Sequence, residues 1–312
     1  MASDASANTD VIKEWCGHKG RVLETVAEFD VIECDCCRFK HIIPLPSVEE
    51  LQKIYRHEYY QSEKPLYLQR VEEDQAWWNL VFDERYDLFE KFLAPAHRRI
   101  LDIGSGPGVF LKRGMDRGWQ VLGLEPSSSA AAYSQQQGVN TINDFLSPSL
   151  LESLGKFSVV NLAEVLEHVP SPVDVLHMAN KLLEPGGILC VVVPNDYNPI
   201  QQAATQLQLT RSWWLAPPHH INYFNPDSLK ELLCSTGFSV QHSETTFPID
   251  CFLLMGDNYI GNDTLGRQCH ARRKEFELNL EKAGLRRLKQ SLYQAFLDLG
   301  MGREIVMFAT KI

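Results

Sequence analysis

Three alternating glycines, Gly104, Gly106 and Gly108, follow a short apolar run at residues 99–103. Glycine permits positive φ and leaves backbone amides open to a ligand. A helix that begins directly after such a turn favours negative charge at its N-terminus. Glu125 ends the next apolar run, where a carboxylate can accept hydrogen bonds from both hydroxyls of a ribose. The pattern indicates a site for a ligand that carries a nucleoside.

A second set of reactive side chains lies further along the chain. Glu164, Glu167 and His168 are spaced as i, i+3 and i+4, which predicts that one helical turn presents all three on one face. His219 and His220 follow the next expected strand and return to the same rim. Two interpretations stay open. In the first, one of the three histidines is a general base beside Glu164. In the second, Glu164, Glu167 and His168 bind a divalent ion such as Mg²⁺ together with His220.

The elements that must position these groups alternate between strands and helices. Expected strands cover residues 99–103, 119–124, 157–162, 188–193 and 304–310. Expected helices cover residues 48–60, 109–117, 127–137 and 171–184, with a further helix from 225 and a helical insertion at 263–300. Strands that alternate with helices predict an α/β fold, a doubly wound parallel sheet covered on both faces.

We divide the chain into four expected segments. These are a Cys-rich N-terminal module (1–60), a helical lead-in (61–95), a cofactor-binding core (96–245), and a helical cap insertion with the last strand (246–312).

Four ordered motifs resemble those of class I S-adenosylmethionine (SAM)-dependent methyltransferases. Residues 101–108 resemble their motif I, 121–127 their second motif, 157–169 their fourth-strand motif, and 182–187 the stretch before their fifth strand. The resemblance spans about residues 95–245 and implies a Rossmann-like, seven-stranded, mostly parallel sheet. It also implies a set of SAM-binding residues. These are Asp102, Gly104, Ser105, Gly106, Gly108, Glu125, Asn143, Asp144, Phe145 and Ala163. Asn161 stands where the family often has Asp.

The activity implied by the resemblance is transfer of a methyl group to a small molecule, with a hydroxyl oxygen as the expected acceptor and nitrogen or carbon left open. The Glu164, Glu167 and His168 arrangement is similar to small-RNA 2′-O-methyltransferases and to ubiquinone-pathway O-methyltransferases, in which it serves a metal. A metal-assisted RNA 2′-O-methyltransferase is therefore one alternative. A nicotinamide-dependent oxidoreductase and a non-catalytic SAM-binding protein are the others.

The N-terminal cysteines resemble the zinc-type module that opens many small-molecule and sugar methyltransferases of this branch. The resemblance implies Zn²⁺ ligands at Cys16, His18, Cys34 and Cys37, with Cys36 as a substitute. Lys13 occupies the first ligand position of the family pattern, so a degenerate module without metal is the alternative.

Composition narrows the expected partners. The 312 residues carry 40 Asp and Glu against 30 Lys and Arg, a formal net charge of −10. With this excess of acidic residues, we expect the chain to lack the broad basic surface that is needed to bind nucleic acid. No apolar run reaches the ~20 residues of a membrane helix, and residues 1–10 carry no apolar signal segment. We therefore expect a cytoplasmic protein that acts on a small molecule without a membrane or nucleic-acid partner.

Two further features concern the acceptor. Trp213, Trp214 and the Pro217–Pro218 turn either wall the acceptor pocket or pack as a lid. The helical insertion carries basic residues that either steer an anionic acceptor or form a solvated helix face. They are Arg267, Arg272, Arg273, Lys274, Lys282, Arg286, Arg287 and Lys289.

Overall fold

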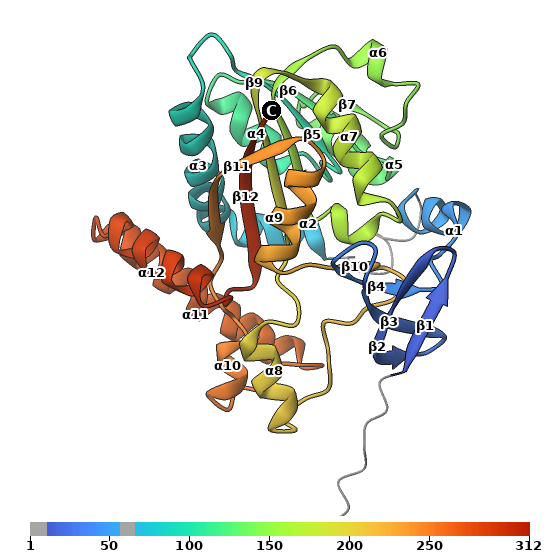
Figure 1. Cartoon of the computed structure of the whole chain (residues 1–312). Helices are drawn as coiled ribbons and strands as arrows, with labels where there is room; N and C mark the ends of the chain where they lie inside the picture. Colours follow the sequence, from blue (N-terminus) through green and yellow to red (C-terminus); the bar gives the residue numbers. More distant parts are fainter. Residues whose placement is uncertain (1–10, 57–65) are drawn as a thin grey trace, which may run out of the picture.

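The computed structural model describes residues 11–56 and 66–312, and its larger sheet has seven strands in the order β11-β12-β9-β8-β5-β6-β7 (Figure 1). The strands are β5 (Arg99–Ile103), β6 (Gln120–Leu124), β7 (Thr141–Ile142), β8 (Phe157–Ala163), β9 (Leu183–Pro194), β11 (Phe238–Thr245) and β12 (Glu304–Lys311). Strands β7, β6, β5, β8 and β9 run parallel, and β12 is antiparallel to both of its neighbours. The predicted doubly wound α/β fold is confirmed.

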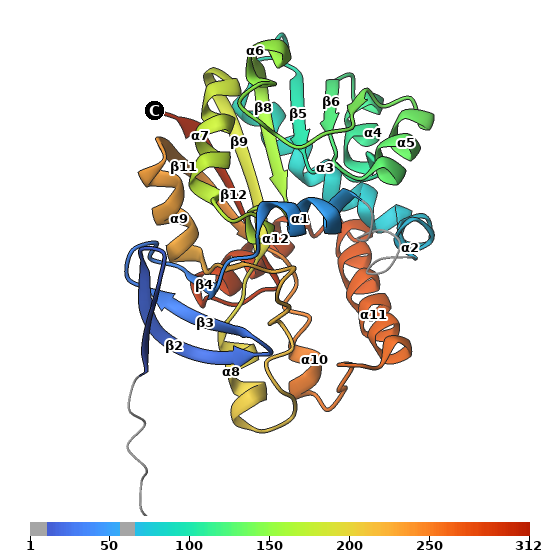
Figure 2. The same cartoon turned by 90° about the vertical axis from the view of Figure 1, so that its right-hand side faces the viewer.

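Helices cover both faces of this sheet (Figure 2). Successive side chains of a strand point to opposite faces, so Leu101 joins the core under α6, α7 and α9, whereas Ile100 joins the core under α3 and α4. The helix bounds are α2 (Tyr67–Glu73), α3 (Gln75–Phe92), α4 (Val109–Asp116), α5 (Ser128–Gln136), α6 (Leu151–Leu154), α7 (Pro172–Leu182), α8 (Pro199–Gln206), α9 (Pro226–Ser235) and α10 (Cys251–Leu254).

The start of β9 differs from the sequence prediction. Residues 184–187 were expected to end a helix, but α7 ends at Leu182 and β9 begins at Leu183, which pairs with Phe157 of β8. The ladder shifts register between Phe157 and Val159. The strand therefore accommodates Pro185 and two glycines outside its regular pairing.

The N-terminal segment, predicted as a Cys-rich module, forms a second, antiparallel sheet. Its order is β1-β2-β3-β4-β10. The strands are β1 (Ile12–Trp15), β2 (His18–Val26), β3 (Phe29–Cys34), β4 (Lys40–Ile43) and β10 (Asn222–Tyr223). Strand β10 comes from the connection after β9, so the two sheets share a segment of chain. The helix predicted over residues 48–60 begins as α1 (Val48–Lys53). Residues 57–60 of that prediction lie outside the described residues.

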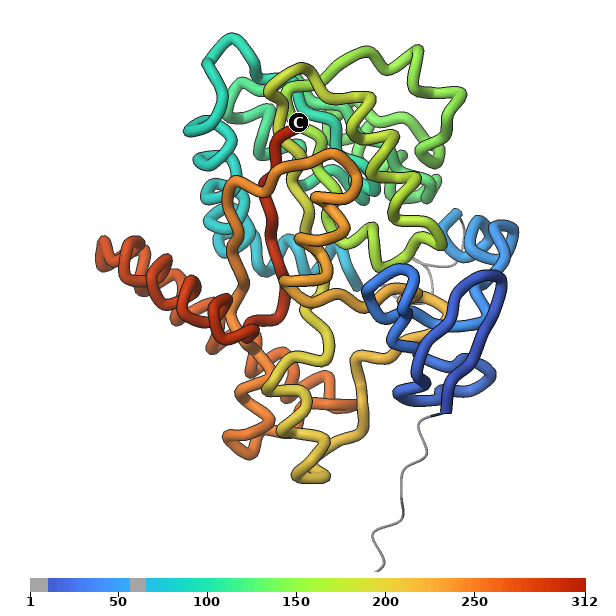
Figure 3. Tube along the Cα trace, in the orientation of Figure 1, coloured from blue at the N-terminus to red at the C-terminus, as the bar shows by residue number. Residues whose placement is uncertain are grey.

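The predicted helical insertion forms α11 (Asp263–Lys282) and α12 (Arg286–Asp298), which extend from the body of the molecule (Figure 3). Its basic residues were interpreted as steering an anionic acceptor or as forming a solvated helix face, and most of them are engaged with acidic residues of the protein instead. Six of the eight make ion pairs within the protein, with Asp74, Asp87, Glu84 and other acids as partners. Four of these residues fasten the insertion to α3 and to the end of α2, namely Arg267, Lys274, Arg286 and Lys289.

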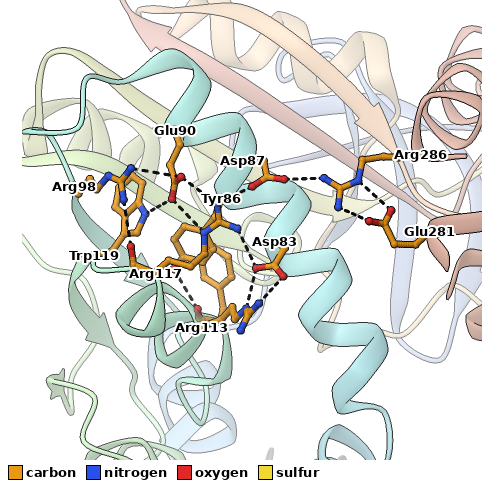
Figure 4. Close-up of polar contacts among 11 residues, drawn as sticks. Asp83, Tyr86, Asp87, Glu90, Arg98, Arg113, Arg117, Trp119, Glu281 and Arg286 are labelled. Carbon is orange, nitrogen blue, oxygen red and sulfur yellow. Dashed lines mark hydrogen bonds and ion pairs between the residues drawn. The ribbon is translucent and has the colours of Figure 1, made fainter. Parts of the chain in front are cut away.

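Helices α3 and α4 are joined by a network of charged side chains (Figure 4). Arg117, just after α4, contacts Asp83, Asp87 and Glu90 of α3 at 3.0, 2.7 and 3.1 Å. Arg113 pairs with Asp83 as well, at 2.6 Å.

Within the described parts of the chain, no helix combines the length and the apolar character needed to cross a membrane.

Candidate active site

A cavity of about 650 Å³ opens at the carboxyl ends of β5, β6 and β8. In a doubly wound sheet this edge is where ligands bind. The glycine turn after β5 forms one wall, and α1 lies across the strand ends opposite it (Figure 2). The helical side contributes Val48, Leu51, Gln52, Tyr55, Tyr67, Trp78, Phe82 and Arg85. Pockets of this size enclose drug-sized ligands.

The glycine turn is built as the sequence predicts. Gly104, Gly106 and Gly108 all have positive φ, at 74°, 54° and 76°. A Cβ on Gly104 would lie 2.7 Å from the Cγ2 atom of Val165, so the turn requires glycine there. Gly104 and Gly106 line the cavity together with Ser105, but Gly108 does not. Gly108 is the N-cap of α4 and packs against Ser134.

Two buried carboxyl groups lie below this turn. One Glu125 oxygen accepts a hydrogen bond from the N–H of Gly106 at 2.7 Å, and the other accepts from Ser127 at 2.8 Å. Desolvation nevertheless raises the pKa of Glu125 to about 7. Asp102 accepts from the side-chain amide of Asn161 at 2.7 Å, and burial raises its pKa to about 7 as well. Both groups therefore change charge near neutral pH.

The residues expected around an adenine are only partly at the cavity. Asp144 and Phe145 line it, as does Ala163 at the end of β8. Arg56 reaches from the other wall, 3.0 Å from Asp144 and 5.1 Å above the Phe145 ring. Asn143 is not among the lining residues. Its amide donates to the carbonyls of Glu125 and Pro126 instead, so it holds the chain that follows β6.

The predicted single helical face of Glu164, Glu167 and His168 is not formed. Glu164 precedes the short 3₁₀ turn Leu166–His168 and has a positive φ of 57°. Glu167 is fully buried, and burial beside Glu164 raises its pKa well above the usual range. Among the described residues, donor atoms of Glu167, His168 and His220 lie within 4.8 Å of one another, and this group does not include Glu164.

His168 lines the cavity, whereas His219 and His220 do not. The Nδ1 atom of His168 lies 2.8 Å from the His219 carbonyl oxygen and 2.9 Å from the Tyr55 hydroxyl. His220 packs edge-on against the His168 ring, with the ring centroids 4.9 Å apart. His168 therefore lies at the cavity, and its ring is held in place by contacts with residues 219–220, which lie outside the cavity lining.

Of the two alternatives for Trp213 and Trp214, the structure favours packing over a wall of the cavity, which neither residue lines. Trp214 is buried in a core with residues of the N-terminal sheet, against which Trp213 also packs. Sequence reasoning instead missed the helical wall, above all Tyr55 and Arg85. Arg85 is the only Lys or Arg among the described lining residues, and its guanidinium lies 5.6 Å from the Phe110 ring centroid. For Arg85 the available signal was the polar–aromatic stretch at residues 61–95.

The N-terminal sheet gathers a cluster of four possible metal ligands, His18, Cys34, Cys37 and His41. His18 Nδ1 lies 3.8 Å from the Cys34 sulfur and 3.3 Å from the Cys37 sulfur. The cluster includes His41 in place of the expected Cys16, which is exposed in the turn between β1 and β2. Lys13 forms an ion pair with Asp30 and takes no part in the cluster.

Comparison with known proteins gives a consistent family. Residues 77–243 match the model of a family described as a methyltransferase domain. A ubiquinone biosynthesis O-methyltransferase from Erwinia tasmaniensis is 35% identical over 98 residues, which cover 29% of this chain and 40% of that protein. One from Burkholderia vietnamiensis is 31% identical over 126 residues, covering 36% and 54%. The match thus spans about half the length of these curated relatives.

Among solved structures, the plantazolicin methyltransferase BamL in complex with a desmethyl analogue and SAH has a TM-score of 0.51 at 16% identity, covering 83% of this chain and 94% of that one. This likeness supports the fold. The family model covers more than half of the chain, and its match includes the glycine turn, Glu125 and His168. The chain belongs to the methyltransferase-domain family.

Proposed function

We propose that the protein is an O-methyltransferase that acts on a small molecule whose hydroxyl is attached to a flat, largely apolar body. The observation that carries the proposal is His168, which stands at the wall of an aromatic-lined cavity that also contains the glycine turn. Tyr55, Tyr67, Trp78 and Phe82 give this cavity faces against which a flat acceptor can stack. The names of the curated relatives support oxygen as the methyl acceptor.

In this proposal SAM lies along the glycine turn. Glu125 binds the ribose hydroxyls, Gly104 and Gly106 contact the methionine end, and Asp144 and Phe145 contact the adenine. Arg85 is suited to the methionine carboxylate, because a planar guanidinium matches a carboxylate in a two-point hydrogen bond. No described residue forms an ion pair with Arg85, so its charge is available to a ligand in the cavity.

His168 is the proposed general base. A carbonyl oxygen can only accept a hydrogen bond, so Nδ1 carries the proton that points at the His219 carbonyl 2.8 Å away. The lone pair is then on Nε2, which lies 3.6 Å from the buried carboxyl of Glu167. It takes the proton of the acceptor hydroxyl as the oxygen bonds to the methyl carbon and the carbon–sulfur bond breaks, which leaves S-adenosylhomocysteine (SAH). Alignment in a closed cavity supplies most of the acceleration, ~7–11 kcal/mol, and the base ~10²–10⁴-fold.

A divalent ion is a second way to activate the same hydroxyl. Glu167, His168 and His220 fit such an ion, because their donor atoms lie within 4.8 Å of one another and Glu167 is a fully buried carboxyl. A bound Mg²⁺ or similar ion would lower the pKa of the hydroxyl. Glu164 adjoins this group through its influence on Glu167.

The test is SAH formation across a panel of phenols, catechols and aliphatic alcohols. We expect turnover on aromatic hydroxyl acceptors and a loss of ~10²–10⁴-fold in kcat for His168→Gln, with SAH binding retained. The matched control is His177→Gln, an exposed histidine of α7. Loss of activity in chelator with recovery on Mg²⁺ would assign the activation to the ion. Turnover of amines but no alcohols would overturn the O-methyltransferase proposal.

We also propose that the N-terminal sheet binds one structural Zn²⁺ through His18, Cys34, Cys37 and His41. His41 Nδ1 lies 2.9 Å from the Ile42 carbonyl, which fixes its proton there and leaves Nε2 as the acceptor. That Nε2 atom is buried without a hydrogen-bond partner among the described residues. Two thiolates and two imidazoles are a tetrahedral zinc set, and a bound cation would satisfy Nε2.

The zinc proposal predicts about one zinc per chain by plasma mass spectrometry. Cys34→Ser and His41→Gln should lose the metal and lower the melting temperature, because ligand binding supports this small sheet. Cys16→Ser, at an exposed cysteine outside the cluster, should keep both. Zinc that is lost with Cys16 but kept without His41 would contradict this ligand set.

A further inference from the structure

The outward face of α12 carries a row of apolar residues, which we call the leucine stripe. It consists of Leu285, Leu288, Leu292, Ala295 and Leu299. Leu285, Leu288 and Leu299 are 43%, 56% and 65% exposed, and Ala295 is exposed as well. These are large exposures for aliphatic side chains, and only Leu292, at the centre of the stripe, is half-buried. The row belongs to the insertion that extends from the body of the molecule (Figure 3).

The inward face of the same helix combines charged groups with the half-buried Tyr293, Phe296 and Leu297. The one residue of α12 that is buried is Lys289, which pairs with Glu84 of α3 at 2.6 Å. Arg286 pairs with Glu281 and with Asp87 (Figure 4). A surface helix normally turns its apolar side to its own core. In α12 a second set of apolar residues faces outward, and Leu285, Leu288 and Leu299 stay exposed, so packing within the chain does not explain the leucine stripe.

The spacing of the stripe fits a second helix. Its members follow one another at intervals of three, four, three and four residues, which is the a/d pattern of a two-helix seam. Amphipathic helices that lie on lipid usually present a wider apolar face. Their flanking basic residues must also be available to headgroups, whereas Arg286 and Lys289 are in ion pairs here. The narrow seam therefore favours a helix over a membrane surface.

The charges along α12 indicate that the second helix is another copy of α12 in the antiparallel direction. Arg287 stands at the beginning of the helix without an ion pair among the described residues, and Asp298 stands exposed at its end. Antiparallel pairing about a two-fold axis near Leu292 brings each basic beginning beside an acidic end. It also pairs Leu285 with Leu299 of the other copy. A parallel pair would bring like charges together instead.

We propose that the leucine stripe is a self-association surface through which two copies of this chain pair α12 antiparallel across a two-fold axis. The contact is isologous, so it closes at the dimer. One short helix from each copy buries less than the ~1,200 Å² of a standard stable interface. The dimer is therefore weak and concentration-dependent.

The test is sedimentation velocity of the full chain from low micromolar to near-millimolar concentration. We expect the wild-type protein to shift from monomer towards dimer over this range, and Leu288→Glu to stay monomeric. The matched control is Leu207→Glu, which changes a leucine that is 64% exposed but lies beyond α8, outside the stripe. Circular dichroism and SAH binding verify that each variant is folded, because none of these residues lines the cavity.

A charge swap tests the direction of pairing. Arg287→Glu should weaken the dimer at least threefold, and Arg287→Glu combined with Asp298→Arg should restore it. A wild-type chain that remains monomeric at every concentration would overturn the proposal. So would equal effects of Leu288→Glu and Leu207→Glu, or a monomer whose stripe binds phosphatidylglycerol vesicles. Failure of the double variant to restore the dimer would overturn the antiparallel arrangement.

Discussion

At the scale of single residues, Glu125 connects the shape of the glycine turn to its proposed ligand. Its two oxygens accept the N–H groups of Gly106 and Ser127, so the same carboxyl that would bind a ribose also fixes the turn around it. Burial raises its pKa to about 7. Hydroxyl donors favour the ionised form, so a bound ribose lowers that pKa.

The affinity for SAH should depend on pH, because ribose binding and proton binding at Glu125 are linked. Below pH about 7, binding must release a proton from Glu125, so SAH affinity should fall as the pH drops, by up to about tenfold per unit. Above pH about 8 the affinity should level off. Calorimetric titration of SAH from pH 5.5 to 8.5 measures this profile. Glu125→Gln should bind more weakly and lose most of the slope, and an unchanged slope in that variant would refute the role.

Gly104 offers a second residue-scale prediction. Gly104→Ala adds a Cβ that meets Val165 at 2.7 Å on a backbone with a φ of 74°, so we expect SAH to bind at least about tenfold more weakly, since local strain costs ~1–3 kcal/mol. Gly118→Ala is the control, because its φ of 83° carries a similar strain but nothing lies within 4 Å of the added atom. It should lower stability and leave SAH affinity intact. Equal losses of affinity would contradict this reading.

At the scale of elements, Arg117 holds α3 against the helix that follows the glycine turn (Figure 4). Its side chain is 21% exposed, so its hydrogen bonds to carboxylates are partly shielded from water. Arg117→Met should lower the free energy of unfolding by about 1–2 kcal/mol in urea titrations. Lys112→Met, which breaks the exposed pair with Asp116, should cost less than about 0.5 kcal/mol. Similar losses for both variants would argue against a special role for Arg117.

Some of the strands could be predicted from the sequence, and others could not. Strands β5, β6 and β8 are short, mostly apolar runs, and they were predicted within a residue or so. Strand β1 reads Ile-Lys-Glu-Trp and is mostly exposed, so it has no apolar alternation to detect. Strand β10 has two residues and exists only because it pairs with distant β4. Such pairing is a tertiary effect that local pattern does not contain.

The site divides in the same way. The glycine turn, Glu125 and His168 were predicted because their spacing lies within single strand–turn units. Tyr55 and Arg85 were missed because their approach to the cavity depends on how α1 and α3 pack on the sheet. His41 was missed as a possible ligand because it follows Cys37 by four residues in another strand, and only the β3–β4 pairing brings it to the cluster.

At the scale of the whole molecule, buried carboxyl groups make stability depend on pH. Burial raises the pKa of Asp102 and Glu125 to about 7 and that of Asp196 to about 6. A raised pKa in the folded state stabilises the protein below the unfolded value, near 4, and this contribution is lost as the pH rises through the folded value. The pKa of Asp74 falls to about 2 through its contacts with Arg267 and Lys274. Its contribution to stability is therefore present above pH about 4 and is lost as the pH falls towards 2.

The lowered pKa values of His41 and His270, about 4 each, add stability as the pH rises from about 4 to 6.5 and offset part of this loss. The free energy of unfolding should therefore decrease most steeply between pH about 6 and 7.5. Urea unfolding monitored by circular dichroism from pH 4 to 9 measures this curve. Asp102→Asn should flatten part of the decline. Stability that instead rises steadily from pH 5 to 8 would show that these carboxyl groups are ionised in the folded protein.

Strand β10 ties the two sheets together in one respect that concerns catalysis. Its residues Asn222 and Tyr223 complete the N-terminal sheet, and they come directly after His219 and His220, which support His168. The Asn222 side chain also donates to the carbonyls of Leu166 and Val169, on either side of His168. Strands β1 to β4, more than a hundred residues before His168 in the chain, thereby help to fix the position of the proposed base. A substitution that unfolds this small sheet should therefore also displace His168 at the cavity.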